Sequence, residues 1–289
     1  MITKFGVGKV LAILLVAGAG ACTSQAVSGG TGGAGGGSTG SGGTTPTGGG
    51  GNTLACGTGS LKPTMGVACP PVPSSGLITD FTHAADAGTA EARFGDDSTT
   101  LSGGESTYAN AGSTIMSDVS AGDWHITAHV ANYSGFNLYF DNVVVNNMPC
   151  DMIDASAYTG ISFTIWGTSG GNAITMGMGI VDDTPTPSWF ASVDAGAVST
   201  PGSCIPTSGS QYYHPGCADP MNAISIPATA TSAATAKTVS LKWTDFTGGA
   251  CKPNVIPSQI TSISWQFLWT TTTAPYDVDI HIDNLMFTK

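Results

Sequence analysis

Ile161-Ser-Phe-Thr-Ile-Trp166 decides the fold class of this 289-residue chain. Large apolar and smaller polar residues alternate in it with a period of two, which is typical of a strand with one buried face. Clusters of Gly, Pro, Asn and Thr, without a helical spacer, separate the stretches that repeat this alternation. Those stretches are Trp124–Val130, Ile174–Ile180, Val239–Trp243, Ile263–Trp269 and Val278–Ile282. We therefore predict an all-β, antiparallel β-sandwich over residues 77–289.

The phase of the alternation predicts which large side chains are buried. Four tryptophans follow the apolar phase and are expected in the core. They are Trp124, Trp243, Trp265 and Trp269. Three histidines take the opposite phase, where a strand histidine is usually solvated or hydrogen-bonded across strands. They are His125, His129 and His281.

Residues 1–21 have the pattern of an export signal. Lys4 and Lys9 precede and flank an apolar run, which closes with small residues before Cys22. This ending resembles a bacterial lipoprotein signal, in which the cysteine is lipidated, but it also fits ordinary signal-peptidase cleavage. We expect an exported protein, either an outer-membrane or cell-surface lipoprotein anchored through Cys22 or a secreted one.

Residues 22–53 form a Gly/Ser/Thr-rich tether, whose composition cannot bury apolar area and predicts disorder. Its repetitive part has an expected r.m.s. reach of about 25–30 Å. Residues 54–76 follow as an irregular lead-in rich in Cys and Pro. The tether would hold the β domain away from its anchoring or cleavage point.

Six cysteines remain when Cys22 is set aside, an even number that predicts three disulfides in an oxidising compartment. Fifteen pairings are possible. Close spacing favours Cys56 with Cys69 and Cys204 with Cys217, which leaves Cys150 with Cys251. A zinc site is the competing interpretation, although the chain has no C-x-x-C pair.

The charge balance limits the partners. The chain has 8 basic and 19 acidic residues and a net charge of −11. Such a surface repels phosphate groups, so nucleic acid and an anionic lipid face are excluded as partners of the domain.

Two stretches at the ends of the domain carry a resemblance to a known family. They are Gly76-Leu-Ile-Thr-Asp-Phe81 and Tyr276-Asp-Val-Asp-Ile-His-Ile-Asp-Asn-Leu-Met-Phe287. Together they resemble the first and last strands of galactose-binding-like jelly rolls, and among these the bacterial carbohydrate-binding modules. Gly135–Phe140, Ile153–Phe163 and Val239–Phe246 agree with this resemblance.

The resemblance implies a jelly roll with one sheet that can be concave and hold a glycan. It also implies a calcium ion where the first and last strands meet, with Asp80 and Asp283 as ligands that backbone carbonyls would complete. The alternative is that both carboxylates accept hydrogen bonds at a turn or strand end.

A sugar-binding site needs an aromatic platform for the apolar C–H face and planar polar groups for the hydroxyls. Outward strand positions and the long segment from Asp182 to Pro220 supply the candidates, although that segment could instead cover a sheet edge. The candidates are Trp166, Trp189, Tyr212, Tyr213, Gln266 and Asp182. A common site requires the strand candidates to converge on one concave face.

Catalysis is not expected. Glycoside hydrolysis usually needs two carboxylates, and the only glutamates, Glu91 and Glu105, stand in polar, Gly/Ser-rich surroundings. No G-x-S-x-G, H-E-x-x-H, P-loop or dinucleotide motif is present. We expect a monomer that binds a β-glycan polysaccharide. The alternatives are a structural or adhesive envelope protein without a sugar site, and a polysaccharide hydrolase or lyase using loop aspartates.

Overall fold

The computed structural model describes only part of the chain, and all of the described part belongs to the unit of residues 38–289. The described residues are 71–83, 94–95, 101–119, 122–140, 142–144, 148–150, 152–170, 172–181, 218–269 and 274–289. The expected signal, tether and most of the lead-in lie outside them.

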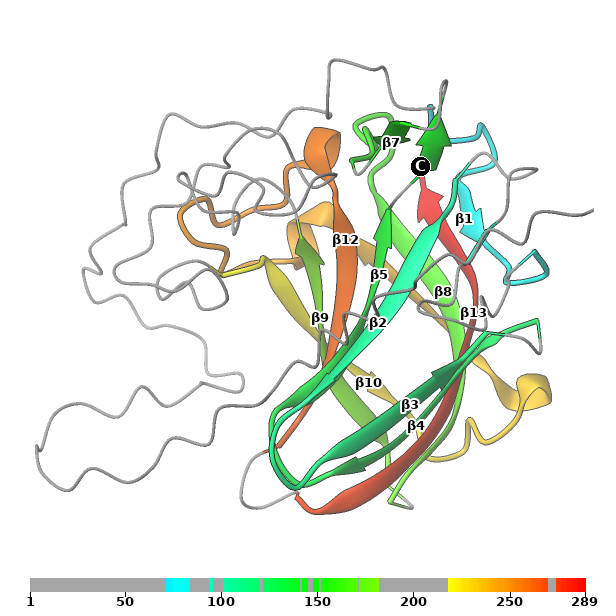
Figure 1. Cartoon of the computed structure of the whole chain (residues 1–289), viewed down its shortest axis with the longest axis vertical. Coiled ribbons are helices and arrows are strands. Elements are labelled where there is room, and N and C mark those ends of the chain that lie inside the picture. Colours follow the sequence, from blue (N-terminus) through cyan, green and yellow to red (C-terminus); the bar gives the residue numbers. More distant parts are fainter. Residues whose placement is uncertain are drawn as a thin grey trace, which may run out of the picture. The chain divides into compact units, whose positions relative to one another are not determined.

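Six strands form the first sheet, and all of their pairings are antiparallel. Five of them run in the order β11 (Lys237–Lys242), β8 (Gly160–Ser169), β13 (Tyr276–Thr288), β4 (Trp124–Val130) and β3 (Thr114–Asp118). The short β1 (Leu77–Thr79) pairs with the end of β13. Figure 1 shows β13 in red, with the cyan β1 beside its C-terminal end.

Five strands form the second sheet, again antiparallel throughout. Their order is β10 (Met221–Ile226), β9 (Ile174–Val181), β12 (Ser262–Phe267), β5 (Ser134–Phe140) and β2 (Gly103–Ala109). A small hairpin pairs β6 (Asn142–Val144) with β7 (Met148–Cys150). The helical elements among the described residues are three short 3₁₀ turns, η2 (Ala233–Thr235), η3 (Trp243–Asp245) and η4 (Pro257–Gln259).

The two sheets pack face to face through an aromatic core. Trp265 of β12 is fully buried, and its ring lies 5.4 Å from that of Trp124 on β4 and 5.9 Å from that of Phe163 on β8. Phe136 of β5 stacks on Trp265 at 5.3 Å. Edge-to-face and stacked rings at these distances contribute beyond their buried area. The predicted antiparallel β-sandwich is therefore confirmed.

The alternation predicted the burial pattern of β4 and β13 correctly. Trp124, Ile126, Ala128 and Val130 are buried, whereas the histidines between them face outward. The prediction was wrong for Trp269, whose side chain is 41% exposed. The strand that carries Trp265 ends at Phe267, so the inward phase does not extend to Trp269. Trp243 is buried as expected but belongs to η3, because β11 ends one residue earlier.

The cysteine pairings stay predictions. Cys251 is disulfide-bonded, and its partner falls outside the side chains that the structure describes. Cys150 closes β7, with its side chain also outside them. The other four domain cysteines lie outside the described residues. None of the described helices has the length and hydrophobicity needed to cross a bilayer.

Two methionines provide a direct test of the core assignment. Met178 on β9 is fully buried, whereas Met116 on β3 is 73% exposed. We expect Met178→Ala to lower the free energy of unfolding by about 2–5 kcal/mol, because it leaves a cavity between the sheets. Met116→Ala, the matched control, should change it by less than about 0.5 kcal/mol. Urea denaturation measures both, and equal losses would contradict the packing described here.

Candidate functional site

The outer face of the five-stranded sheet carries mostly small and polar residues. The outward residues alternate along each strand with buried residues such as Phe136, Trp265 and Met178. Outward residues that pair across neighbouring strands form rows across the sheet. Three of these rows consist of residues that pair across β2, β5, β12 and β9, in that order. They are Tyr108-Gly135-Gln266-Gly177, Ser106-Asn137-Ser264-Gly179 and Gly104-Tyr139-Ser262-Val181.

Gln266 stands in the middle of this face between two glycines. Gly135 of β5 is its partner on one side and Gly177 of β9 on the other. A Cβ atom on Gly135 would clash with the Tyr108 hydroxyl and the Trp265 carbonyl, so this position accepts no side chain. The partly exposed Gln266 amide thus lies between the Tyr108 phenol, which covers Gly135, and the Met221 side chain, which covers Gly177, and it can donate and accept in fixed directions.

Three aromatic side chains, which we name the aromatic cluster, gather at one end of this face. Tyr108 of β2 lies 5.1 Å from Tyr133, and Tyr133 lies 6.4 Å from Trp269 in an edge-to-face arrangement. Tyr133 is 38% exposed and Trp269 is 41% exposed. Together with Met116 these are the exposed large hydrophobic residues of the described chain. The cluster therefore offers apolar ring surface to solvent next to Gln266.

Tyr108 anchors the cluster to the sheet. Its ring crosses Gly135, and its hydroxyl donates to the backbone carbonyl of Trp265 at 3.5 Å. Burial raises the pKa of the Tyr108 phenol well above its usual value, and the nearby Tyr133 and Asp219 add to this rise. The phenol is therefore a fixed neutral donor at physiological pH.

Polar groups continue along the face away from the aromatic cluster. The Asn137 amide nitrogen donates to the Ser106 hydroxyl at 3.4 Å. Tyr139 lies across Gly104, where an added Cβ would meet its ring. Asp219, which precedes β10, lies next to Gly179. The face thus combines amide, hydroxyl and carboxylate groups with aromatic rings at both ends, and the Met221 side chain covers Gly177 and Gly179 on β9.

Trp166 and Gln266 do not share a site. Trp166 lies on β8 of the six-stranded sheet, directly opposite His281 of β13, and its ring stacks on the His281 imidazole at 5.0 Å. It therefore faces outward on the opposite side of the sandwich from Gln266. Trp166 and Gln266 therefore do not meet the requirement of lying on one concave face, because their strands belong to different sheets.

The remaining sugar-site candidates lie outside the described residues. They are Trp189, Tyr212, Tyr213 and Asp182. Sequence reasoning missed the aromatic cluster, partly because it placed Trp269 in the core. The weak alternation of Gly103–Ala109 gave little sign of a strand, and Tyr133 belongs to the turn before β5. The run of threonines that follows Trp269 was the available sequence signal that the strand ends before this residue.

Asp80 and Asp283 lie near the junction of β1 and β13. The Asp80 carboxylate accepts hydrogen bonds from the Thr82 hydroxyl at 2.6 Å and the Thr82 amide at 3.1 Å, which lowers its pKa. Burial raises the pKa of Asp283, and the negative charges of Asp80 and Asp123 raise it further. The negative charge of Asp80 and Asp123 around Asp283 is the kind of charge that a calcium ion would neutralise.

Neither a hollow nor a carboxylate pair in the described ranges forms an evident active site. A hollow of about 280 Å³ beside β1 is lined by Asp80 and His83 and by apolar side chains such as Phe94. This volume is below the roughly 300–1,000 Å³ typical of ligand pockets. Glu105 is paired in register with the inward Leu138, so it does not share the outer face with Gln266. Glu91 lies outside the described residues.

No family model and no curated protein matches the chain. Its structural matches include the family 11 carbohydrate-binding module of a cellulosomal cellulase of Clostridium thermocellum, with 12% identity, 73% of this chain and 92% of that chain covered, and a TM-score of 0.41.

Two further matches have lower TM-scores. A family 11 module from Clostridium thermocellum, in complex with a β-1,3-1,4-mixed-linked tetrasaccharide, has 13% identity, coverage of 64% and 88%, and a TM-score of 0.38. An agarase has 11% identity, coverage of 64% and 24%, and a TM-score of 0.32.

The buried phenol of Tyr108 predicts an alkaline loss of stability. Above about pH 10 the unfolded chain releases this proton while the folded state keeps it, so the free energy of unfolding falls as the pH rises. The free energy of unfolding of Tyr108→Phe should fall less steeply with pH than that of the wild type, by up to about 1.4 kcal/mol per pH unit. Tyr276, whose pKa burial raises to about 12, contributes equally in both proteins. Urea denaturation between pH 9 and 11 measures the slopes, and identical slopes would refute the burial of this phenol.

Proposed function

We propose that this chain is an exported, non-catalytic polysaccharide-binding protein that holds a β-glycan on the outer face of its five-stranded sheet. The observation that carries the proposal is the exposed aromatic cluster beside Gln266 on the outer face of the five-stranded sheet. A sugar ring would stack on Tyr133 or Trp269 while its hydroxyls meet the amides of Gln266 and Asn137. These are the two kinds of contact that carbohydrate recognition requires.

The shape of this face supports an extended ligand. The three outward rows run across neighbouring strands, with amide and hydroxyl side chains between Tyr108 at one end and Tyr139 at the other. A face with polar groups along its length suits a polymer that continues past the site in both directions. The acidic net charge favours a neutral glycan over a polyanionic one.

Export, anchoring and oligomeric state belong to the same proposal. The pattern of residues 1–21 supports export, and the small residues before Cys22 support a lipoprotein of the outer membrane or cell surface. The tether would let the domain search nearby polymer within its reach. We propose a monomer with three disulfides, which the even number of domain cysteines supports. Secretion without a lipid anchor is the alternative that the same residues allow.

Alanine variants on the two outer faces test the glycan site. We expect Trp269→Ala and Gln266→Ala each to weaken binding to the best glycan at least tenfold, about 1.4 kcal/mol, because each removes a central contact. Trp166→Ala is the matched control, since it deletes the same ring from the opposite sheet and should leave binding unchanged. Affinity electrophoresis against cellulose, mixed-linkage glucan, xylan and mannan selects the glycan, and calorimetry gives the dissociation constants.

The opposite results identify the rival functions. Retardation by no glycan would favour a structural or adhesive envelope protein. Loss of binding in Trp166→Ala with Trp269→Ala unaffected would move the site to the six-stranded sheet. Release of reducing ends or unsaturated products from the same panel would show a hydrolase or lyase and overturn the non-catalytic proposal.

Calcium at Asp80 and Asp283 is a further part of the proposal. The surroundings of Asp283 support it, because burial and the negative charges of Asp80 and Asp123 raise the pKa of Asp283, and a bound cation would offset these charges. We expect millimolar Ca²⁺ to raise the melting temperature of the wild type and to have no effect on Asp283→Asn. Asp154→Asn is the control, because Asp154 is an exposed turn residue elsewhere that caps the Ser156 amide. No Ca²⁺ effect on the wild type would leave Asp80 and Asp283 as turn and strand-end hydrogen-bond acceptors.

A further inference from the structure

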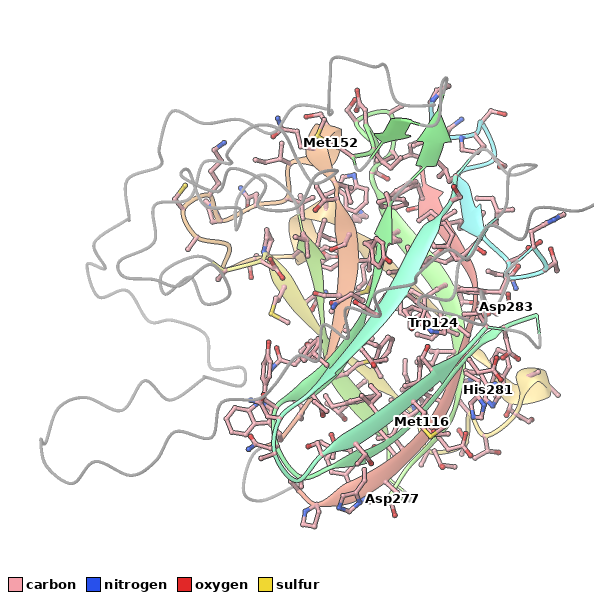
Figure 2. All side chains as sticks on the ribbon, viewed as in Figure 1. Met116, Trp124, Met152, Asp277, His281 and Asp283 are labelled. Carbon is pink, nitrogen blue, oxygen red and sulfur yellow. The ribbon has the colours of Figure 1, made fainter. Side chains whose placement is uncertain are left out.

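A row of three flat rings crosses the outer face of the six-stranded sheet. His281 of β13 pairs in register with Trp166 of β8 on one side and His125 of β4 on the other. The two imidazoles stack at 4.2 Å with an angle of 1° between their planes. Figure 2 labels Asp277, His281 and Asp283 in order along the red ribbon of β13. The row brings two imidazoles together on adjacent central strands.

A carboxylate completes the group. Asp279, two residues before His281 on β13, has its Oδ1 atom 2.8 Å from His125 Nε2 and 3.9 Å from His281 Nε2. One ligand atom from each of these three residues lies within 4.8 Å of the other two. Ligands at about 2.0–2.2 Å from a tetrahedral zinc ion lie about 3.4 Å from one another. The observed spacings bracket that value, so modest side-chain rotations would bring the three atoms around one ion.

The second nitrogen of His281 is already engaged. Its Nδ1 atom lies 3.0 Å from the Asp123 carboxylate, which is the less exposed partner of this pair at 19%. An ionised carboxylate only accepts, so the tautomer of His281 with its proton on Nδ1 donates to Asp123 and leaves the Nε2 lone pair for a cation. Metal-binding histidines commonly donate their other N–H to a carboxylate in this manner. Asp123 therefore acts as a positioning residue for His281.

The donor set selects the class of cation. Two imidazole nitrogens and one carboxylate oxygen suit Zn²⁺ and related divalent transition metals, whereas Ca²⁺ and Mg²⁺ prefer oxygen ligands only. The Asp279 side chain is 63% exposed, so the fourth coordination position would open to solvent. The parallel imidazoles must turn until their planes converge on the ion, and His125 and His281, at 34% and 28% exposure, are both accessible to solvent.

We propose that His125, His281 and Asp279 form a zinc site that joins β4 to β13 on the face opposite the proposed glycan surface. Bound zinc stabilises the folded state by mass action, since the unfolded chain does not hold these three ligands together. The site joins strands that are far apart in sequence, because His125 and His281 come together only through the β4–β13 pairing. With its fourth position open, it also offers a coordination point to an external ligand.

Zinc titration of the full chain without an affinity tag tests the proposal. Calorimetry should show one Zn²⁺ per chain, and His125→Gln and His281→Gln should each raise the dissociation constant at least tenfold. His129→Gln is the matched control. His129 lies on the same strand and contacts Asp277 at 2.7 Å, but it stands outside the group, so its variant should change the constant less than twofold.

Two further variants keep the test independent of folding. Asp279→Asn alters an exposed side chain and should also weaken zinc binding at least tenfold. Asp123→Asn should weaken it about tenfold or more while the one-to-one stoichiometry and the glycan affinity stay unchanged. Wild-type protein that binds no zinc, or binds it equally after His125→Gln and His281→Gln, would overturn the proposal and leave the group as ordinary cross-strand ion pairs. The visible spectrum of bound Co²⁺ reports the coordination directly.

Discussion

The packing of Trp265 between the two sheets is the constraint on which the rest of the molecule depends. Its ring meets Trp124 and Phe163 of the facing sheet and Phe136 of its own. A slip of one residue in β12 would turn this ring toward solvent and bring a polar residue into the core. The packing of the core therefore fixes the register of β12 and, with it, which of its residues face outward.

The two outer faces that result have different chemistry. Beside Trp265, the alternation turns Gln266 outward between two glycines, on a face with an aromatic end. On the other sheet the same alternation turns the ring of His281 outward between Trp166 and His125. The first face suits stacking and amide contacts with a neutral polymer, and the second suits a cation. One core thus supports two separate surfaces without competition between them.

Strand β13 concentrates charge on the second face. Its outward positions Asp277, Asp279, His281 and Asp283 follow one another at intervals of two residues. The strand then shifts register after Asp283, where Asn284 takes a positive φ of 51°, a conformation that asparagine tolerates better than most residues. The Asp283 backbone carbonyl also accepts a hydrogen bond from the Thr164 hydroxyl of β8. This shift sets the place at which Asp283 meets the negative charge of Asp80.

The sequence by itself determined the strands with clear alternation, their inward faces and the sandwich, because period-two alternation is a local property that burial enforces along each strand. It also identified Gln266 and His281 as outward residues. Only the tertiary structure decided which outward residues become neighbours, since that depends on strand order between segments far apart in the chain. It separated Trp166 from Gln266, exposed Trp269 where β12 ends, and brought His125 and His281 together across 156 positions of sequence.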